Sequence, residues 1–367
     1  MTRTILQARC LKKHFRTGGG FGSAATIRAV DDVSLDIKEG ETFAIVGESG
    51  CGKSTIARLL MRLLTPTEGQ VAFDGADISG LRGKSLTALR RDMQFIFQDP
   101  FSSLNPRMSV GKLIGEPLET HFPEMSKAER RQKVAELLNQ VGLRPEHAER
   151  YPHEFSGGQR QRIGIARALA SSPKLIIGDE PVSALDVSVQ AQVINLLSDL
   201  RDALGLTLVI IAHDLAVIRH MSDRVAVMYL GQIVECGPVD TIFKHPRHPY
   251  TRALLSAIPV AEYGSRQPQT ALVGETPSPA NPPSGCRFHT RCPFARDRCK
   301  SESPTLRDTD IGADHTAACH FFEEIAAAHP DLVMAASKQR STAAETRFTL
   351  YHDAMHDRAT AGPRQEK

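Results

Sequence analysis

Residues 43–55 read Phe-Ala-Ile-Val-Gly-Glu-Ser-Gly-Cys-Gly-Lys-Ser-Thr, and this stretch decides the fold. Its four leading apolar residues predict a buried strand, Gly47 and Gly52 frame a turn, and Lys53 opens a helix. A strand, a G-x-x-x-x-G-K-S loop and a helix in this order form a phosphate-binding loop. A turn that merely needs glycine is the competing interpretation, but eight matching residues in the right context argue against it.

Each residue type in this loop has a physical reason. Glycines let successive backbone N–H groups point at a phosphate, and the helix N-terminus adds unpaired donors and partial positive charge. Lys53 is expected to reach the β- and γ-phosphates, and the Ser54 hydroxyl to ligate Mg²⁺. The sequence therefore predicts that a nucleoside triphosphate binds here. The residues predicted to bind it are Gly47, Glu48, Ser49, Gly50, Cys51, Gly52, Lys53, Ser54 and Thr55.

Length and composition narrow the classes of function. A chain of 367 residues is too long for one ordinary core and suggests two domains, or one domain with an extension. The net charge of +3 is too small to argue for nucleic acid, which is not expected as a partner. The N-terminal residues lack the apolar stretch of a signal peptide, and runs such as 208–212 are too short to span a membrane. If this protein acts at a membrane, we expect it to do so as a peripheral subunit.

The first 40 residues predict short strands at 5–10 and 33–37, separated by a glycine-rich hairpin insert around 18–22. Phe15 and Phe21 are aromatic side chains available to stack on an adenine, and a core position remains open for either.

Beyond the phosphate-binding loop, apolar periodicity predicts a helix at about 56–63, a strand at 71–73 and a strand at 91–97. The last of these leads into a loop rich in Pro and Ser, with Gln98 at its mouth. Residues 110–170 are predicted to be mostly helical.

Two of these helices begin at capping boxes. Ser126 and Glu129 form one, and Ser156-Gly-Gly-Gln159 forms another that starts a helix ending near Leu169. Ser-x-x-Gln alone is a weak signal, whereas the full run Phe155-Ser-Gly-Gly-Gln-Arg-Gln-Arg162 is far more selective.

Two further strands end in polar side chains. Residues 175–178 predict a buried strand that ends at Asp179 and Glu180, which places both acids in the crevice where α/β sheets bind ligands. We expect Asp179 to hold Mg²⁺, through water, and Glu180 to lie close to an attacking water. The strand 207–212 ends at His213, for which a γ-phosphate contact is favoured over an ordinary surface histidine.

Together these motifs resemble the nucleotide-binding subunit of ATP-binding cassette (ABC) transporters over roughly residues 5–250. The resemblance implies an α/β P-loop NTPase core with an antiparallel β subdomain, and a helical subdomain at about residues 99–170. It implies that two such subunits pair head-to-tail, so that each ATP lies between the loop of one and the signature residues of the other. The implied interface residues are Ser156, Gly157, Gly158, Gln159 and, in the D-loop, Asp186.

The implied chemistry is in-line attack by water on the γ-phosphate of ATP. Glu180 is expected to orient or deprotonate that water, while Lys53, Mg²⁺ and the signature helix spread the developing charge. Gln98, a further expected Mg²⁺ ligand, and His213 are expected to sense the γ-phosphate. Because no catalytic element is degenerate, we expect a hydrolysis-competent ATPase.

Residues 98–109 and 248–255 look like the oligopeptide/dipeptide importer subfamily, and so does the segment that follows. A Pro-rich linker at 261–285 precedes four cysteines, Cys286, Cys292, Cys299 and Cys319, in a predicted extension over 251–325. Four thiolates at this spacing suit a [4Fe–4S] cluster, as the resemblance also implies. Paired C-x-x-C spacing is absent, which argues against an ordinary zinc ribbon, and zinc remains the alternative. His289, His315 and His320 are possible replacement ligands. Residues 326–367 are predicted to form a loose helix and a disordered tail.

The expected function is that of the ATPase subunit of a di- or oligopeptide importer, peripheral at the cytoplasmic face of the inner membrane. Expected partners are two membrane permease subunits, a second ATPase subunit (identical or related) and an extracytoplasmic solute-binding protein. The loop after Gln98 and the helices to about residue 150 are expected to dock the permease. Glutathione or a nickel complex remain alternative cargoes, and a soluble or redox-controlled regulatory ATPase remains an alternative class.

Overall fold

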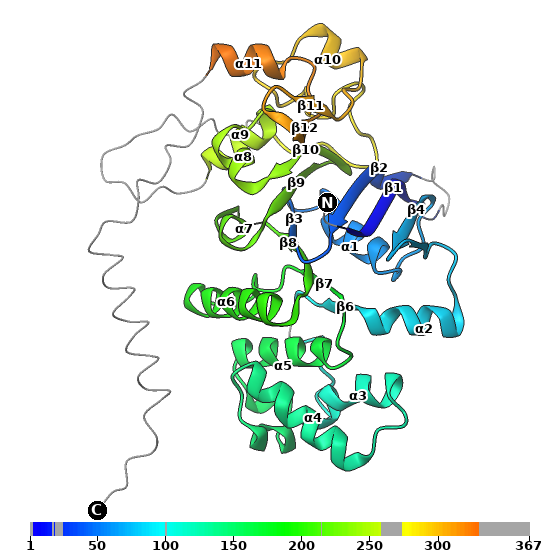
Figure 1. Ribbon diagram of the computed structural model, residues 1–367. Helices are drawn as coiled ribbons and strands as arrows, with labels where there is room; N and C mark the ends of the chain where they lie inside the picture. Colours follow the sequence, from blue (N-terminus) through cyan, green and yellow to red (C-terminus); the bar gives the residue numbers. More distant parts are fainter. Residues whose placement is uncertain are drawn as a thin grey trace, which may run out of the picture.

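A computed structural model describes residues 3–16, 18, 25–99, 101–213, 215–257 and 274–329 (Figure 1). The hairpin insert with Phe21, the linker over 258–273 and the tail from 330 lie outside the described residues.

The strands are β1 (Thr4–Arg16), β2 (Thr26–Lys38), β3 (Thr42–Val46), β4 (Glu68–Phe73), β5 (Ala76–Asp77), β6 (Met93–Ile96), β7 (Leu175–Asp179), β8 (Thr207–Ala212), β9 (Arg224–Tyr229), β10 (Gln232–Pro238), β11 (Arg307–Thr309) and β12 (Gly312–Ala317). The α-helices are α1 (Lys53–Leu60), α2 (Gly83–Asp92), α3 (Val110–His121), α4 (Lys127–Gln140), α5 (Gly157–Leu169), α6 (Val187–Leu204), α7 (Leu215–Met221), α8 (Val239–Lys244), α9 (Pro249–Ser256), α10 (Asp297–Ser301) and α11 (Phe322–Ala328).

The larger sheet positions the site. It has eight strands in the order β11-β12-β10-β9-β3-β8-β7-β6, and the neighbours β9, β3, β8, β7 and β6 run parallel. β3, β7 and β8 are buried along their length because parallel strands are covered on both faces. The carboxyl ends of β3, β6, β7 and β8 therefore meet at one edge of the sheet, where ligands bind in folds of this kind.

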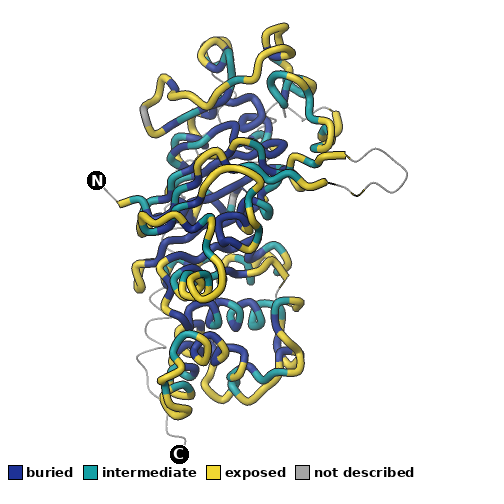
Figure 2. Tube along the Cα trace, turned by 90° about the vertical axis from the view of Figure 1, so that its right-hand side faces the viewer, coloured by how far each residue is buried: buried dark blue, intermediate teal, exposed yellow. Residues whose placement is uncertain are grey.

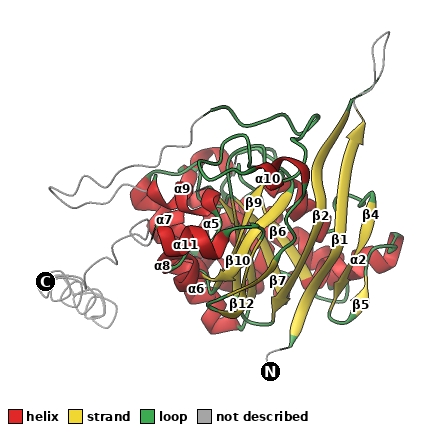
Figure 3. Cartoon of the chain, turned by 90° about the horizontal axis from the view of Figure 1, so that it is seen from above, coloured by secondary structure: helices red, strands yellow, loops and turns green. Residues whose placement is uncertain are grey.

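The two faces of β3 belong to two different cores, because successive side chains of a strand point to opposite sides. Phe43 and Ile45 pack with α1 and the four-stranded antiparallel sheet, whose order is β2-β1-β4-β5. Ala44 and Val46 pack with the helices on the other side. Figure 3 shows the long β1–β2 hairpin beside the larger sheet, and Figure 2 shows the buried residues that run through the middle.

Helices α3, α4 and α5 form the helical subdomain that the resemblance implies, at the lower end of Figure 1. The predicted capping box at Ser126 is confirmed, since its hydroxyl accepts from the Glu129 N–H and the Glu129 side chain accepts from the Ser126 N–H. The apolar face of α4 is buried at Val134, Leu137 and Leu138. The expected α/β cassette with an antiparallel and a helical subdomain is thus confirmed.

The strand predicted over 91–97 is wrong at its start. Arg91 lies in α2, and only Met93–Ile96 form β6. No residue of α2 is fully buried, although Leu89 packs partly against the core. α2 runs directly into β6 with no Gly or Pro between them, so the sequence carries no turn signal for this boundary.

The C-terminal residues join the main sheet. β12 pairs antiparallel with β10, with Glu235 opposite Ala317 and Cys236 opposite Thr316, and β11 pairs with β12. α10 and α11 lie beyond these strands at the top of Figure 1. Within the described ranges, no helix is both long enough and apolar enough to cross a bilayer.

Candidate nucleotide-binding site

The loop between β3 and α1 requires glycine at both ends of its turn. A Cβ on Gly47 would lie 2.2 Å from the carbonyl oxygen of Met228, and one on Gly52 would lie 2.1 Å from that of Ala29. Gly52 also has a left-handed φ of 108°. The backbone on either side thus fixes the shape of the loop.

Lys53 lies under this loop with only 5% of its surface exposed. Its ammonium group donates to the carbonyl oxygens of Gly47 and Glu48, at 2.7 and 2.9 Å. The lysine side chain is flexible, so its ammonium group can exchange these carbonyl acceptors for other oxygens. The ammonium group already lies where the phosphates are expected.

Ser54 and Asp179, the residues expected to bind Mg²⁺, are in contact. The Ser54 hydroxyl donates to Asp179 Oδ1 at 2.9 Å. Burial raises the pKa of the Asp179 carboxyl, although the hydrogen bond from Ser54 works in the opposite direction. A hydroxyl beside a buried carboxylate is a ligand pair that suits a hard divalent cation. The charge of such a cation would compensate for the burial of the Asp179 carboxylate.

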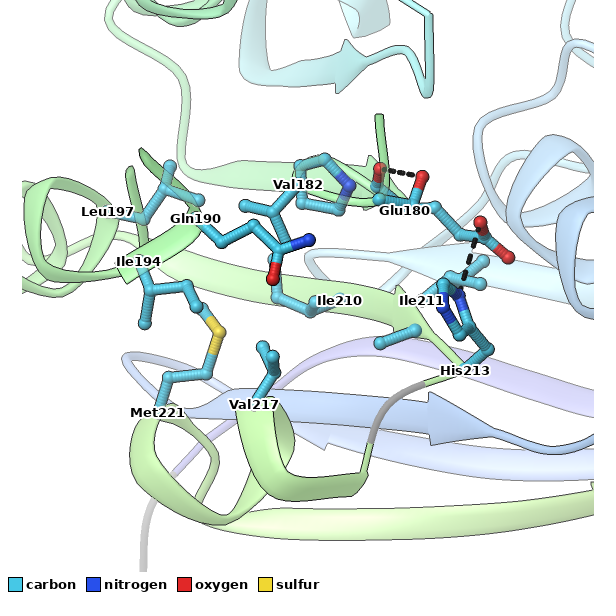
Figure 4. Close-up of a pocket in the computed structure, with 13 residues that line it drawn as sticks. Glu180, Val182, Gln190, Ile194, Leu197, Ile210, Ile211, His213, Val217 and Met221 are labelled. Carbon is cyan, nitrogen blue, oxygen red and sulfur yellow. Dashed lines mark hydrogen bonds and ion pairs between the residues drawn. The ribbon is translucent and has the colours of Figure 1, made fainter. Parts of the chain in front are cut away.

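Glu180 meets the side chains that follow two other strands. Its Oε2 accepts a hydrogen bond from Gln98 Nε2 at 2.9 Å. The same oxygen lies 3.5 Å from His213 Nδ1, as Figure 4 shows. The backbone of Glu180 is in the left-handed region, with φ of 48°, which costs free energy for a residue with a Cβ and is found mostly at functional sites. β6, β7 and β8 thus bring Gln98, Glu180 and His213 to one point.

A small cavity lies behind Glu180 and His213. It has a volume of about 40 Å³. In Figure 4 these two residues lie at one end of it, and Ile194, Leu197 and Met221 lie at the other. The side chains at the far end of this cavity are apolar.

The signature residues lie at the start of α5. The Ser156 hydroxyl accepts from the Gln159 N–H at 3.3 Å, and Gln159 Oε1 accepts from the Ser156 N–H at 3.1 Å. Gly157 and Gly158 form the first turn of α5. In Figure 1, α5 lies in the helical subdomain, apart from α1 and the loop before it, so a single chain does not bring the signature to its own phosphate-binding loop.

Two predicted residues remain, Asp186 and Phe15. Asp186 is the N-cap of α6. Phe15 lies near the end of β1 with 38% of its surface exposed, and the ammonium of Lys13 lies 5.3 Å from its ring centroid.

One set of contacts in the site was not predicted from the sequence. Arg291, beyond the linker, forms two hydrogen bonds to the carboxylate of Glu48, at 2.7 and 3.0 Å. The hydroxyl of Thr276 also donates to Glu48, at 3.1 Å. The only signal for these contacts was the polar character of the segment between Cys286 and Cys292.

The four C-terminal cysteines line one small cavity of about 10 Å³. Burial raises the pKa of the Cys292 thiol to about 12 and that of Cys319 to about 11, and it also raises the pKa of Cys286. Among the residues that the structure describes, no group of three or more His, Cys, Asp or Glu side chains is arranged to hold a metal ion.

The three histidines considered as replacement ligands make other contacts. His315 lies 2.8 Å from Glu235 Oε1. The Nδ1 atom of His289 lies 2.8 Å from the carbonyl oxygen of Cys286, and the Nε2 atom of His320 lies 2.9 Å from that of Glu302.

Two family models match the chain. The ABC transporter model covers residues 30–183, and the model of the oligopeptide/dipeptide transporter C-terminal region covers residues 234–299. A probable peptide ABC transporter ATP-binding protein of Sinorhizobium fredii is 54% identical over 90% of this chain and 93% of its own length. The oligopeptide transport ATP-binding protein OppF of Escherichia coli is 52% identical over 86% of this chain and 96% of its own.

A solved structure shares the fold of this chain. The ATP-binding cassette MJ0796, in a dimeric post-hydrolysis state bound to ADP and phosphate, is 34% identical with a TM-score of 0.58. It covers 64% of this chain and 99% of its own. The fold, the motifs at the strand ends and these likenesses agree, and the chain belongs to the ABC transporter ATPases, in the oligopeptide/dipeptide transporter family.

Proposed function

We propose that this chain hydrolyses ATP to power the import of di- or oligopeptides, as a peripheral subunit at the cytoplasmic face of the inner membrane. The observation that carries this proposal is the convergence of Gln98, Glu180 and His213 beside the phosphate-binding loop. The relatives named for oligopeptide and peptide transport support the choice of cargo. An extracytoplasmic solute-binding protein would deliver that cargo to the permease.

The proposed chemistry follows from the positions of the side chains. Lys53 would exchange its two carbonyl acceptors for the β- and γ-phosphate oxygens. Ser54, Asp179 and Gln98 would hold Mg²⁺, which neutralises charge on those oxygens when bound. Glu180 would hold the attacking water and take its proton, while His213 would donate a hydrogen bond to the γ-phosphate.

A second ATPase subunit would complete each site. The first turn of α5 begins at Gly157 and Gly158, and the N-terminus of a helix favours a phosphate group. The first turn of α5 lies apart from the phosphate-binding loop of its own chain. In a head-to-tail pair, the signature residues of one subunit would therefore complete the ATP site of the other. ATP would then bind at the interface between the two subunits, and its hydrolysis would remove the contact that keeps this interface closed.

The surface proposed to dock the permease lies between the sheet and the helical subdomain. A cavity of about 480 Å³ opens there, with residues of α2, β6 and α3 in its wall. Leu63 and Phe97 line it and are 42% and 43% exposed. Exposed apolar side chains around an open groove suit an amphipathic helix of a partner, and a cytoplasmic helix of the permease is the occupant we propose.

Leu63→Asp should separate docking from nucleotide binding. We expect the tagged variant to lose the two permease subunits during purification from membranes, because a charge in the groove opposes burial. Its ATP binding should match that of the unmodified chain. Leu204→Asp is the matched control, because Leu204 is 47% exposed at the end of α6. If the unmodified chain brings down no permease, a regulatory ATPase is the better interpretation.

We further propose that Cys286, Cys292, Cys299 and Cys319 hold a [4Fe–4S] cluster. Their shared cavity supports this assignment. A cluster binds one thiolate at each of four irons and so needs wider spacing than a single zinc ion bound by four sulfurs at about 2.3 Å.

Metal analysis after anaerobic purification tests this assignment. Iron and acid-labile sulfide should be present and should be lost from Cys292→Ser. They should stay in Cys236→Ser, the matched control, because Cys236 lies on β10 and does not line the cavity. Zinc without sulfide would replace the cluster by a purely structural metal, and a metal-free protein would contradict both assignments.

A further inference from the structure

The phosphate-binding loop carries an acidic side chain directly after its first glycine. Glu48 would hold a negative charge next to the triphosphate of ATP, and like charges at short range weaken binding unless a cation neutralises one of them. Lys53 is the cation of the loop, but its ammonium group is the one expected to contact the phosphates. A second cation is therefore needed to neutralise the Glu48 carboxylate.

Arg291 supplies that cation from the Cys-rich segment, which is the stretch from Cys286 to Cys319. Its Nη1 lies 2.7 Å from Glu48 Oε2 and its Nη2 lies 3.0 Å from Oε1, which is a bidentate pair. The Arg291 side chain is only 5% exposed and that of Glu48 is 22% exposed. Bidentate pairs of this kind are strong, and salt screens them less than it screens pairs on the surface. The hydrogen bonds from Arg291 also lower the pKa of the Glu48 carboxyl, so the carboxylate stays charged.

Neighbouring groups fix the direction of the carboxylate. The Thr276 hydroxyl donates to Glu48 Oε2 at 3.1 Å, and Tyr229 lies 3.4 Å from Arg291 Nη1. The backbone N–H of Glu48 donates to the hydroxyl of Tyr250 at 2.9 Å. Contacts from β9, α9 and the segment after the linker thus hold both the charge and the backbone of this loop residue.

We propose that Arg291 is a positioning residue that neutralises Glu48 and thereby sets the affinity of the phosphate-binding loop for ATP. The Cys-rich segment then takes part in nucleotide binding in its own chain, through one buried arginine. This inference rests on the proposed binding of ATP in the loop. It is independent of what the four cysteines hold.

A double-mutant cycle tests the proposal. Mg-ATP affinity is measured calorimetrically for the purified full chain and for Arg291→Ala, Glu48→Gln and the double variant, with KM and kcat for ATP hydrolysis. We expect Arg291→Ala to raise Kd and KM about tenfold, since it leaves a partly buried carboxylate unpaired beside the phosphates. The double variant should recover most of the affinity that Arg291→Ala loses, because it no longer carries the unpaired carboxylate.

Two further variants separate charge from docking of the Cys-rich segment. Arg291→Lys keeps the charge and should retain most of the affinity. Arg287→Ala is the matched control, because Arg287 is 9% exposed and pairs with Asp31 of β2 instead of the loop. It should loosen the segment, with a lower thermal midpoint, yet bind ATP normally.

The outcomes decide between the proposals. Unchanged ATP affinity in Arg291→Ala, or a loss that Glu48→Gln does not restore, would overturn the charge-neutralising role. A loss in Arg291→Lys as large as that in Arg291→Ala would do the same. If the unmodified chain fails to bind ATP, the proposed function itself is wrong, and that result is visible in the same measurement.

Discussion

Glu180→Gln is expected to bind Mg-ATP as the unmodified chain does and to hydrolyse it at least about a hundredfold more slowly. The amide has the same shape, and its oxygen can still accept the hydrogen bond from Gln98. It cannot take a proton from water, and the general base is therefore lost while the binding groups stay in place. Phosphate release in single turnover, at saturating Mg-ATP, measures the effect.

The same variant should trap the assembled state. If ATP holds two subunits together and hydrolysis releases them, a chain that binds without hydrolysis should accumulate an ATP-dependent assembly on size exclusion. Asp202→Asn is the matched control, because Asp202 is an exposed acid near the end of α6 and its loss should leave turnover unchanged. Normal turnover in Glu180→Gln would falsify the assignment of the general base.

Lys53→Ala is expected to lose ATP affinity by about a hundredfold, since hydrogen bonds to a charged group contribute about 1.5–3 kcal/mol each. The substitution removes the only side-chain cation that lies inside the described part of the loop. It also leaves the carbonyl oxygens of Gly47 and Glu48 without their partner. Titration with a fluorescent ATP analogue measures the loss.

Lys12→Ala is the control for charge alone. Lys12 pairs with Glu68 on the antiparallel sheet and is exposed enough for its removal to be tolerated. Should Lys53→Ala bind the analogue as tightly as Lys12→Ala does, phosphate recognition in this chain would have to come from other groups.

Much of the cassette could be predicted because its motifs are local. Gly47, Gly52 and Lys53 lie within one short stretch, and the strand that ends in Asp179 and Glu180 is apolar along its length. Parallel strands bring their carboxyl ends to one edge, so the meeting of Gln98, Glu180 and His213 follows from three separate strand predictions.

The rest depends on contacts between residues far apart in the chain. α2 runs directly into β6 without a Gly or Pro to mark the boundary. The pair between Glu48 and Arg291 joins positions separated by 243 residues, and either side chain alone resembles an ordinary surface charge. The four cysteines could be grouped from their spacing, but the cavity that they line depends on how α9 and α11 pack around it.

The continuity of the eight-stranded sheet has a consequence for any shortened form of this protein. β12 covers the outer edge of β10, and β11 in turn covers β12. A chain that stopped after α9 would leave β10 with a row of unpaired backbone donors and acceptors, which is a template for adding a strand from another molecule. By covering this edge, β11 and β12 of the Cys-rich segment also protect the cassette from self-association. A truncated cassette would expose the edge of β10 and would be expected to aggregate whether or not nucleotide is bound.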